Sequence, residues 1–377
     1  MLYFLNFAYT PNTASYNRLM GYYKSLDKLG VKATVVFLYP NERFDKIQEK
    51  YQNINIEYYW KKWIPYRGFF RKFTLQRYIN RFISKLVPGD IVYTYSISKM
   101  TALCQGVKGV RVFAEVTEHP KASNGFPHPL LALSDNELNN TINKLSGLFV
   151  ISRPLRDYYI NCGLNASKIQ IINMTVDETR FSNIKKNKTT KYIAYCGTAS
   201  NNKDGVNDLI QAFSLVVEKK HDIKLYIIGK TPSKKDIHNN LKLIKAKGLS
   251  DKIIFTGLLK SEDIPQLLKD ALILVLDRPD TLQAKYGFPT KLGEYLLTGN
   301  PVVVTSVGDI PLFLTDGDSA LISDPSNPKM FSDKILWALD NYDDALVIGR
   351  KGCKIALSNF NAYVETKKLY DFIEKSL

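Results

Sequence analysis

Residues 287–311 read GFPTKLGEYLLTGNPVVVTSVGDIP, and this stretch decides the fold. Pro289 opens a predicted helix, where its missing N–H costs nothing because the first amides of a helix have no partner within it. The run TGN at 298–300 ends that helix. The run VVV at 302–304 is short, apolar and β-branched, which is typical of a buried parallel strand. A loop, a helix, a strand and a second loop therefore succeed one another, and loops at the carboxyl edge of a parallel sheet bind ligands in α/β folds.

Two features of this predicted helix indicate a binding site. Free N–H groups at its start, around Thr290 and Lys291, form an anion site together with the helix dipole. Glu294 lies roughly 200° around the helix from Leu292, at about 100° per residue, and so lies off the apolar face. A carboxylate there can accept hydrogen bonds from a pair of hydroxyls, as on a ribose. The alternative is an ordinary Glu that complements the helix dipole, and periodicity alone does not choose between the two.

The stretch resembles the nucleotide-binding segment of the family-four retaining glycosyltransferases. These have the α/β GT-B fold, two Rossmann-like domains with a central cleft. The family pattern places two Glu residues eight positions apart, then a small residue, Gly, any residue and Pro-Val-Val. Glu294 matches the second Glu, and residues 299–305 match the remainder of the pattern. Tyr286 stands where the family has its first Glu, which approaches the sugar ring. The run PTKLGEY at 289–295 resembles a variant branch of the family.

Composition and length indicate two globular domains. The chain has 377 residues, of which 45% are hydrophobic and 23% charged, as in soluble proteins. No apolar run approaches the roughly 18 residues of a membrane span. The N-terminal run MLYFLNFAY lacks a basic region and a cleavage site, so we expect a strand there and not a signal peptide. The four cysteines lack paired spacing, which favours a reducing, cytoplasmic location.

The net charge of +16 attracts polyanions, namely nucleic acid, an anionic membrane or phosphorylated substrates. We expect no nucleic acid partner, because no nucleic-acid-binding module is recognisable. Residues 69–86 predict a basic amphipathic helix, in which an arc of about 120° is shared by Arg71, Arg77, Arg81 and Lys85. Such a helix, flanked by Trp60, Trp63 and Tyr66, can contact an anionic membrane peripherally, at the inner face of the cytoplasmic membrane. The alternative is an ordinary surface helix with a solvated basic face.

Strand-like and helix-like segments alternate along the chain, which predicts parallel sheets. Ser15 is the expected N-cap of the first helix. No Gly-x-Gly-x-x-Gly follows the first strand, so a dinucleotide site loses its usual support. The polar run at 183–191 is the expected linker between domains.

We therefore expect an N-terminal acceptor-side Rossmann-like domain over 1–182 and a C-terminal nucleotide-sugar-binding one over 183–357. The resemblance implies that residues 358–377 form a closing helix that crosses back to the first domain.

The loop after the predicted strand at 110–115 carries Glu118 and His119, and a His at that position is placed for chemistry near a ligand. The alternative is an ordinary loop histidine. The resemblance implies that His119 faces the donor sugar and that the first domain binds the acceptor. The expected acceptor-side residues are Asn12, Thr13, Glu118 and His119.

A second loop, over 196–205, combines Gly197 and Lys203 and can cradle a phosphate through backbone N–H groups and an ammonium. Without the resemblance, it can equally be an ordinary polar loop. The resemblance implies that Lys203 contacts the donor diphosphate and that the turn near Leu258 holds the base. Catalytic roles are expected for His119, Lys203 and Glu294. The expected donor-binding residues are Gly197, Lys203, Gly229, Leu258, Arg278, Thr290, Lys291, Leu292 and Glu294.

The run DGD at 316–318 superficially resembles the metal-holding Asp-x-Asp of another glycosyltransferase fold. Its central Gly and the apolar run after it favour a turn. No other His or carboxylate cluster has ligand spacing, so we expect no metal. No cofactor is expected either, since the nucleotide-diphosphate sugar is a substrate.

These observations predict a retaining glycosyltransferase that moves a sugar from a nucleotide-diphosphate sugar to a glycan or lipid-linked oligosaccharide acceptor, in surface polysaccharide biosynthesis. One alternative is a nucleotide-sugar epimerase or a phosphorylase of the same fold. Another is a non-catalytic basic protein that binds nucleic acid or an anionic membrane. The sequence does not identify the sugar, the nucleotide or the linkage.

Overall fold

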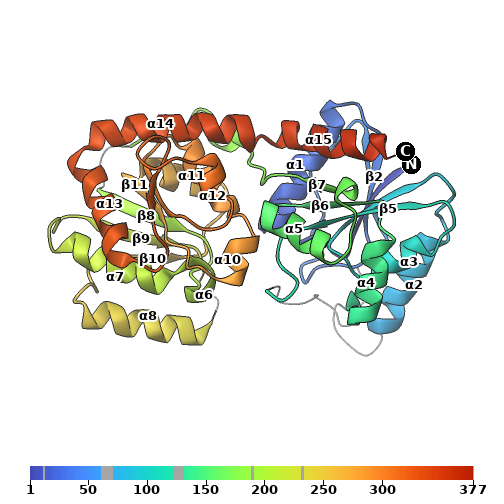
Figure 1. Cartoon of the computed structure of the whole chain (residues 1–377), viewed down its shortest axis with the longest axis horizontal. Helices are drawn as coiled ribbons and strands as arrows, with labels where there is room; N and C mark the ends of the chain where they lie inside the picture. The colour runs from blue at the N-terminus through green and yellow to red at the C-terminus, as the bar shows by residue number, and fades with distance from the viewer. Residues whose placement is uncertain (12, 61–70, 123–130, 188–190, 231–232, 377) are drawn as a thin grey trace. The chain divides into compact units, whose positions relative to one another are not determined.

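The computed structural model describes residues 1–376 except 12, 61–70, 123–130, 188–190 and 231–232 (Figure 1). The chain divides into two compact units. The first unit comprises Met1–Asn173 together with Ala362–Leu377, and the second comprises Met174–Asn361. The run at 183–191, where we expected the linker, belongs to the second unit as far as it is described.

The described part of the first unit contains a sheet of seven parallel strands in the order β3-β2-β1-β4-β5-β6-β7. The strands are β1 (Leu2–Asn6), β2 (Ala33–Phe37), β3 (Ile54–Tyr58), β4 (Ile91–Tyr95), β5 (Arg111–Val116), β6 (Gly147–Val150) and β7 (Ile169–Ile171). The helices are α1 (Ala14–Lys28), α2 (Arg71–Ile83), α3 (Lys99–Gln105), α4 (Asp135–Asn143), α5 (Arg153–Asn161) and α15 (Ala362–Lys375), with a 3-10 turn at Ala166–Lys168. The strand order reverses between β1 and β4, so ligands are expected at the carboxyl ends of these strands.

Helix α1 begins slightly earlier than the sequence suggested. Thr13, and not Ser15, is the N-cap, because its hydroxyl accepts from the Tyr16 amide at 3.3 Å. Both are good capping residues, and only the entry angle of the chain decides which of them adopts the extended conformation that a cap needs. The helix then covers the sheet and packs against α15.

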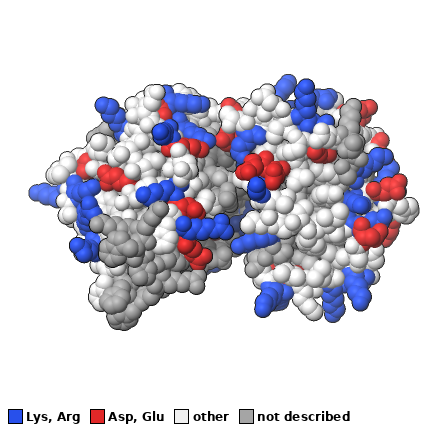
Figure 2. Space-filling view, turned by 180° about the vertical axis from the view of Figure 1, so that it is seen from behind, with Lys and Arg blue, Asp and Glu red and all other residues white. Residues whose placement is uncertain are grey.

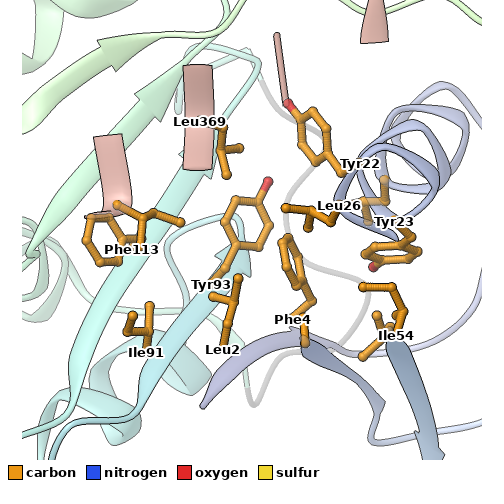
Figure 3. Packing of buried hydrophobic residues seen from close by; sticks show 14 of the residues in the cluster. Leu2, Phe4, Tyr22, Tyr23, Leu26, Ile54, Ile91, Tyr93, Phe113 and Leu369 are labelled. Carbon is orange, nitrogen blue, oxygen red and sulfur yellow. The ribbon is translucent and has the colours of Figure 1, made fainter. Parts of the chain in front are cut away.

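The core of the first unit lies between the sheet and helices α1 and α15 (Figure 3). Aromatic rings fill much of it: the ring of Phe4 lies 5.4 Å from that of Tyr23 and 4.7 Å from that of Tyr93. Leu369 brings α15 into the same cluster, although it stands at the far end of the sequence (Figure 3). The last helix is therefore an integral part of the first core.

A buried ion pair crosses this core. The Arg18 guanidinium donates to the Glu115 carboxylate at 2.5 Å and to the backbone oxygens of Ile172 and Asn173 at 2.8 and 2.6 Å. The hydroxyls of Tyr22 and Tyr93 also donate to Glu115. Donors surround both carboxylate oxygens, as burial of a charge requires.

Helix α2 confirms the amphipathic pattern predicted from the sequence. Leu75, Ile79 and Phe82 are buried, and Arg77 is exposed. Two of the predicted basic residues are partly engaged within the unit, since Arg81 lies 5.2 Å and Lys85 5.1 Å from the centre of the Tyr59 ring. Part of the expected segment, including residues 69 and 70, lies outside the described residues. No described helix is long and apolar enough to cross a membrane.

The second unit contains, in its described residues, a six-stranded parallel sheet in the order β10-β9-β8-β11-β12-β13. Its strands are β8 (Tyr192–Cys196), β9 (Lys224–Ile228), β10 (Ile253–Gly257), β11 (Ile273–Leu276), β12 (Val302–Thr305) and β13 (Leu321–Ser323). Its helices are α6 (Asn201–Asp204), α7 (Val206–Val217), α8 (Lys234–Ala246), α9 (Ile264–Asp270), α10 (Leu282–Tyr286), α11 (Thr290–Leu297), α12 (Ile310–Phe313), α13 (Pro328–Asp340) and α14 (Tyr342–Asn359), with a 3-10 turn at Glu178–Arg180. The expected α/β architecture with two Rossmann-like sheets is confirmed.

The stretch at 287–311 forms the elements that its pattern predicts. Helix α11 follows Pro289, and Gly299 turns the chain with φ +70° after the helix ends. Strand β12 is fully buried and pairs with both β11 and β13, which explains why each of its residues is apolar or a hydrogen-bonded Thr. The run DGD at 316–318 forms the predicted turn, with Gly317 at φ +73°. Its carboxylates pair with Lys334 and Lys351, each at 2.5 Å.

Candidate functional site

The strand order of the second sheet reverses between β8 and β11, so their carboxyl ends define a switch point where ligands bind in open α/β folds. The loop at 197–205 follows β8, and Asp277 and Arg278 follow β11. Most of the expected donor-binding residues come from these loops and from helix α11. The candidate site is built from them.

Glycine is required at this edge because backbones approach closely. Gly197 donates its N–H to the Ile228 oxygen at 2.8 Å, and Gly229 has φ +120°. A Cβ on Gly229 would collide with the Gly197 carbonyl oxygen, and a Cβ on Gly197 would collide with the Lys291 ammonium. Any other residue at position 229 would push the ends of β8 and β9 apart, and a side chain at position 197 would displace the Lys291 ammonium.

Helix α11 is anchored to the end of β8 by one tyrosine. The Tyr295 hydroxyl lies 2.5 Å from the Cys196 amide, which donates to it, and 3.1 Å from the Cys196 oxygen, to which it donates. Tyr295 is fully buried. This anchor fixes the helix by its apolar face and leaves the first turn, with Thr290 and Lys291, at the carboxyl edge.

Lys291 is held in a polar cluster at this edge. Its ammonium donates to the Asp204 carboxylate at 2.5 Å and to the Tyr195 hydroxyl at 3.1 Å. The Tyr195 hydroxyl in turn donates to Asp204 at 2.7 Å. Burial alone would raise the pKa of Asp204, but Lys291 and Arg278 outweigh it and bring the pKa below its usual value. Asp204 is therefore ionised, and it orients Lys291 over Gly197.

Arg278 adds a second, buried cation to the cluster. Its Nε lies 3.9 Å from Asp204 Oδ1 and 3.5 Å from the backbone oxygen of Lys203. Thr305 fixes its backbone, accepting from the Arg278 amide at 2.9 Å and donating to the Arg278 oxygen at 2.7 Å. Lys291 and Arg278 thus face one carboxylate, that of Asp204. With Lys203 on the same loop as Asp204, this cluster carries an excess of positive charge.

Glu294 pairs with a residue that sequence reasoning did not single out. Arg180 donates from Nη1 to Glu294 Oε1, and from Nη2 to the Ser261 oxygen at 3.0 Å and the Ser261 hydroxyl at 3.3 Å. Burial raises the pKa of Glu294, and Arg180 opposes that rise. The guanidinium thus holds the carboxylate in one orientation at the start of α11.

The other expected donor-binding residues occupy different environments. Leu258 is 80% exposed directly after β10, as a residue that borders a ligand could be. Lys203 is half-buried on α6, with its amide bonded to the Ser200 hydroxyl. Leu292 is fully buried, and its N–H donates to the Pro289 oxygen at 3.0 Å. Only the Leu292 backbone therefore lies near the helix start, while its side chain supports the core.

The expected residues of the first unit follow β1 and β5. His119 is buried, its Nδ1 accepts from the Lys121 amide at 3.2 Å, and its ring lies 4.5 Å from that of Tyr158. Burial and the charge of Lys121 lower its pKa, so the ring is neutral at pH 7. Glu118 is half-buried beside it. Thr13 caps α1, and Asn12 lies outside the described residues.

Three residues of the site were missed by sequence reasoning: Asp204, Tyr195 and Arg180. Asp204 stood inside the loop that we singled out, and a carboxylate beside a predicted phosphate site is the one signal that could have drawn attention to it. Arg180 lies 114 residues from Glu294, and no local pattern joins them. Among the described residues, no group of three or more His, Cys, Asp or Glu is arranged to hold a metal ion.

The fold agrees with comparisons to known proteins. Residues 190–341 match the family described as glycosyl transferases group 1. Anabaena HepE, solved in complex with UDP and glucose, has a similar structure, with a TM-score of 0.74 over 99% of both chains at 14% identity. That likeness shows the fold. The chain therefore has a GT-B-like fold, and its residues 190–341 are similar to the glycosyl transferases group 1 family.

Two curated relatives match part of the sequence. Mannosylfructose-phosphate synthase of Agrobacterium fabrum (strain C58) is 30% identical over 141 residues, a match that covers 36% of this chain and 30% of the relative. N-acetyl-alpha-D-glucosaminyl L-malate synthase of Bacillus anthracis is 28% identical over 134 residues, covering 36% and 32%. The matches thus span about a third of the length of these relatives.

Proposed function

We propose that the protein is a retaining glycosyltransferase that transfers a sugar from a nucleotide-diphosphate sugar. The observation that supports this most strongly is the cluster of Lys291, Arg278 and Asp204 at the switch point of the second sheet, where cations exceed carboxylates. Phosphate is stabilised by such an arrangement of ammonium, guanidinium and helix N-terminus. The reaction needs a stabilised diphosphate leaving group more than it needs a nucleophile.

Several residues of the site receive a role in this proposal. Lys203, Lys291 and the N–H groups at the start of α11 bind the diphosphate and stabilise the charge that develops on it. Glu294 accepts from the ribose hydroxyls, and Arg180 holds one of its carboxylate oxygens so that the other faces the sugar. The turn at Leu258 borders the base. His119, which is neutral, contacts the transferred sugar, and a contact of this kind orients the reacting centre.

The base is uracil in this proposal, because the structurally similar HepE was solved with UDP and with UDP-glucose. The acceptor is a glycan or a lipid-linked oligosaccharide bound by the first unit, in the assembly of a surface polysaccharide. Exposed Phe73 and Arg77 on α2 support peripheral contact with an anionic membrane at the cytoplasmic face. Buried Trp60, which we expected to flank that contact, belongs to the core instead.

The distribution of charge does not favour the non-catalytic alternative. Figure 2 shows Lys and Arg side chains scattered over the visible face of each unit and interspersed with Asp and Glu. A nucleic-acid-binding protein gathers its basic residues into a patch or stripe. On that face the basic side chains therefore lie among acidic ones.

A thermal-shift series against UDP, GDP, ADP and CMP tests the donor site. We expect UDP to raise the melting temperature, because a ligand that binds only the folded state stabilises it by mass action. Release of UDP from its sugar conjugate only when an acceptor is present would then separate a transferase from an epimerase or a phosphorylase. Absence of any shift at millimolar nucleotide would refute the donor site.

A thermodynamic cycle that combines one protein variant with one modified nucleotide tests the role of Glu294. Glu294→Ala should weaken UDP binding by roughly tenfold or more, since a charge-assisted hydrogen bond contributes about 1.5–3 kcal/mol. The same substitution should not change the affinity for 2′,3′-dideoxy-UDP, which lacks the hydroxyls. The matched control is Asp343→Ala, an exposed carboxylate on α14 of the same unit. Equal losses for the two nucleotides would contradict the ribose contact.

A further inference from the structure

The first unit contains an open pocket of about 540 Å³ at the carboxyl ends of β1 and β2. Tyr9, from the loop after β1, lines one side, and the loop after β2 contributes Arg43, Phe44, Asp45 and Lys46. The volume lies within the range of roughly 300–1,000 Å³ that is usual for small-molecule sites. Among the described residues, none of those assigned to the donor or acceptor so far lines this pocket.

One side chain holds the two loops together. The Asn41 amide donates to the Tyr9 oxygen at 2.9 Å and to the Asp45 carboxylate at 3.2 Å. The Asn41 oxygen accepts from the amides of Arg43 and Asp45, each at 3.0 Å. The loop after β2 is therefore a hydrogen-bonded turn docked on the loop after β1, and the pocket has a fixed floor.

Phe44 has an unusual backbone, with φ +57°. Positive φ is uncommon for any residue but glycine, and a bulky aromatic there marks strain that the surroundings maintain. The Phe44 ring packs edge-on against the Trp60 ring at 5.6 Å. The strained backbone thus fixes an aromatic ring in the pocket wall, where a glycine would form the same turn at no cost.

The charges in the pocket favour an anion. Arg43 and Lys46 contribute two cations, and Asp45, whose carboxylate is already bonded to Asn41, contributes one negative charge. The Lys46 ammonium lies 4.9 Å from the centre of the Tyr58 ring and 5.3 Å from that of Trp60. Cation–π contacts of this kind hold the ammonium in place without neutralising it. The Arg43 guanidinium suits a carboxylate or phosphate.

The strand order of the first sheet gives the approximate distance between the pocket and His119. His119 follows β5, and β4 separates β5 from β1. Neighbouring strands are about 4.8 Å apart, so the ends of β1 and β2 lie roughly 10 and 14 Å from the end of β5. That span corresponds to an extended ligand that begins near His119 and continues across the carboxyl edge.

We propose that this pocket binds an anionic sugar residue of the acceptor, set back from the residue that receives the transferred sugar. The aromatic rings of Tyr9 and Phe44 contact the apolar face of the sugar ring, and Arg43 and Lys46 bind its carboxylate or phosphate group. The identity of the ligand as an acceptor rests on the proposed transferase function. The binding of an anionic sugar by this unit is measurable without that function.

Titration of the full-length protein with three monosaccharide probes, followed by NMR, tests the pocket. The probes are methyl glucoside, methyl glucuronide and glucose 6-phosphate. We expect at least one anionic probe to bind about tenfold more tightly than the neutral one, as one charge-assisted contact implies. Which of the two anions binds more tightly identifies the charged group as carboxylate or phosphate. Equal binding of all three probes would overturn the proposal.

Variants localise the binding. Arg43→Gln should remove the preference for the anionic probe, whereas Lys50→Gln, an exposed control on the same loop that does not line the pocket, should not. Phe44→Gly allows a positive φ without strain, and it should weaken the binding of the neutral and anionic probes alike. An anion preference that survives Arg43→Gln would place the binding elsewhere and overturn the proposal.

Repeating the titrations with saturating UDP separates this pocket from the donor site. We expect the anionic probe to bind equally with and without UDP. If UDP displaces the probe and Arg43→Gln leaves the affinity for the probe unchanged, the probe binds at the donor site. That result would refute the proposed pocket. If UDP itself does not bind, the proposed function fails, while the effect of Arg43→Gln still decides whether the pocket binds an anionic sugar.

Discussion

Each unit of the molecule buries an ion pair between a cation and a carboxylate, and the two pairs differ in how fully they are satisfied. In the first unit the side chains of Arg18 and Glu115 are 2% and 0% exposed. Arg18 bonds Glu115 and two backbone oxygens, and two tyrosines complete the shell of the carboxylate. Every strong donor and acceptor of this pair has a partner within the core.

The pair in the second unit is less complete. Lys291 is 16% exposed beside a buried Asp204, whose Oδ1 has no hydrogen-bond partner among the described residues. Arg278 adds a further positive charge at 3.9 Å. An ion pair whose donors and acceptors all have partners stabilises or specifies a core. Incompletely paired charges at a sheet edge are typical of ligand-binding sites. The degree of pairing thus separates a structural ion pair from a site of the same chemistry.

Removal of Arg18 should have the largest effect. Arg18→Met leaves Glu115 buried without a counter-charge, so the first unit should lose about 3–5 kcal/mol of stability. Hydrogen exchange of the amides of β1 and β5 measures this loss locally, while UDP binding by the second unit should persist. The double variant Arg18→Met/Glu115→Gln should recover part of the stability. A loss below about 1 kcal/mol would mean that the pair behaves as a surface contact.

Removal of Lys291 should affect a ligand more than the fold. Lys291→Met should weaken UDP binding by roughly ten- to a hundredfold, the value of one charge-assisted bond, but should not change the binding of uridine, which lacks phosphates. Calorimetric titration with both ligands measures the difference. Lys351→Met is the matched control, because Lys351 pairs with Asp318 at an exposed turn of the same unit. Equal weakening of uridine and UDP would show that Lys291 supports the fold of the site instead.

Asp277 offers the most specific test, because it is buried next to Arg278 and its Oδ2 has no hydrogen-bond partner among the described residues. Burial, and then the charge of Asp208, raises its pKa to about 8. The unfolded chain loses this proton near pH 4 while the folded chain keeps it, so stability falls as pH rises from about 4 to 8.

The variant Asp277→Asn cannot ionise and should escape that loss. We expect it to be more stable than the natural chain at pH 8, with the two curves converging near pH 4. Urea unfolding of both chains across this range measures the difference. A constant difference at every pH would show that Asp277 does not titrate between these values.

The sequence predicted those parts of the site that depend on local pattern. The stretch at 287–311 combines a helix start, a helix stop and a buried strand within 25 residues, so neighbours in the chain decide its structure. For the same reason the strands predicted at 110–115 and 302–304 agree closely with β5 and β12. The N-cap of α1 was predicted at Ser15 and is Thr13, because both residues are suitable caps. The turn at 316–318 was also predicted correctly from its glycine.

Long-range partners could not be predicted from the chain. The Arg180–Glu294 pair joins residues far apart in the sequence, and the pocket at Tyr9 and Phe44 depends on a positive φ at a residue that gives no sign of it. Trp60 was expected to flank a helix that can contact a membrane, but the fold buries it. Trp63 and Tyr66, the other two expected flanking residues, lie outside the described residues. Periodicity reports which face of an element is apolar and not what covers that face.

The sequence by itself determined the two parallel α/β units, the placement of the glycine-rich loops and the positions of Lys203, Lys291 and Glu294 near one sheet edge. These depend on hydrogen bonding and burial within short segments, which are local properties of the chain. Only the tertiary structure decided which charges are satisfied. The free energy of a buried charge depends on every group that surrounds it in space, and those groups come from segments that the sequence keeps apart.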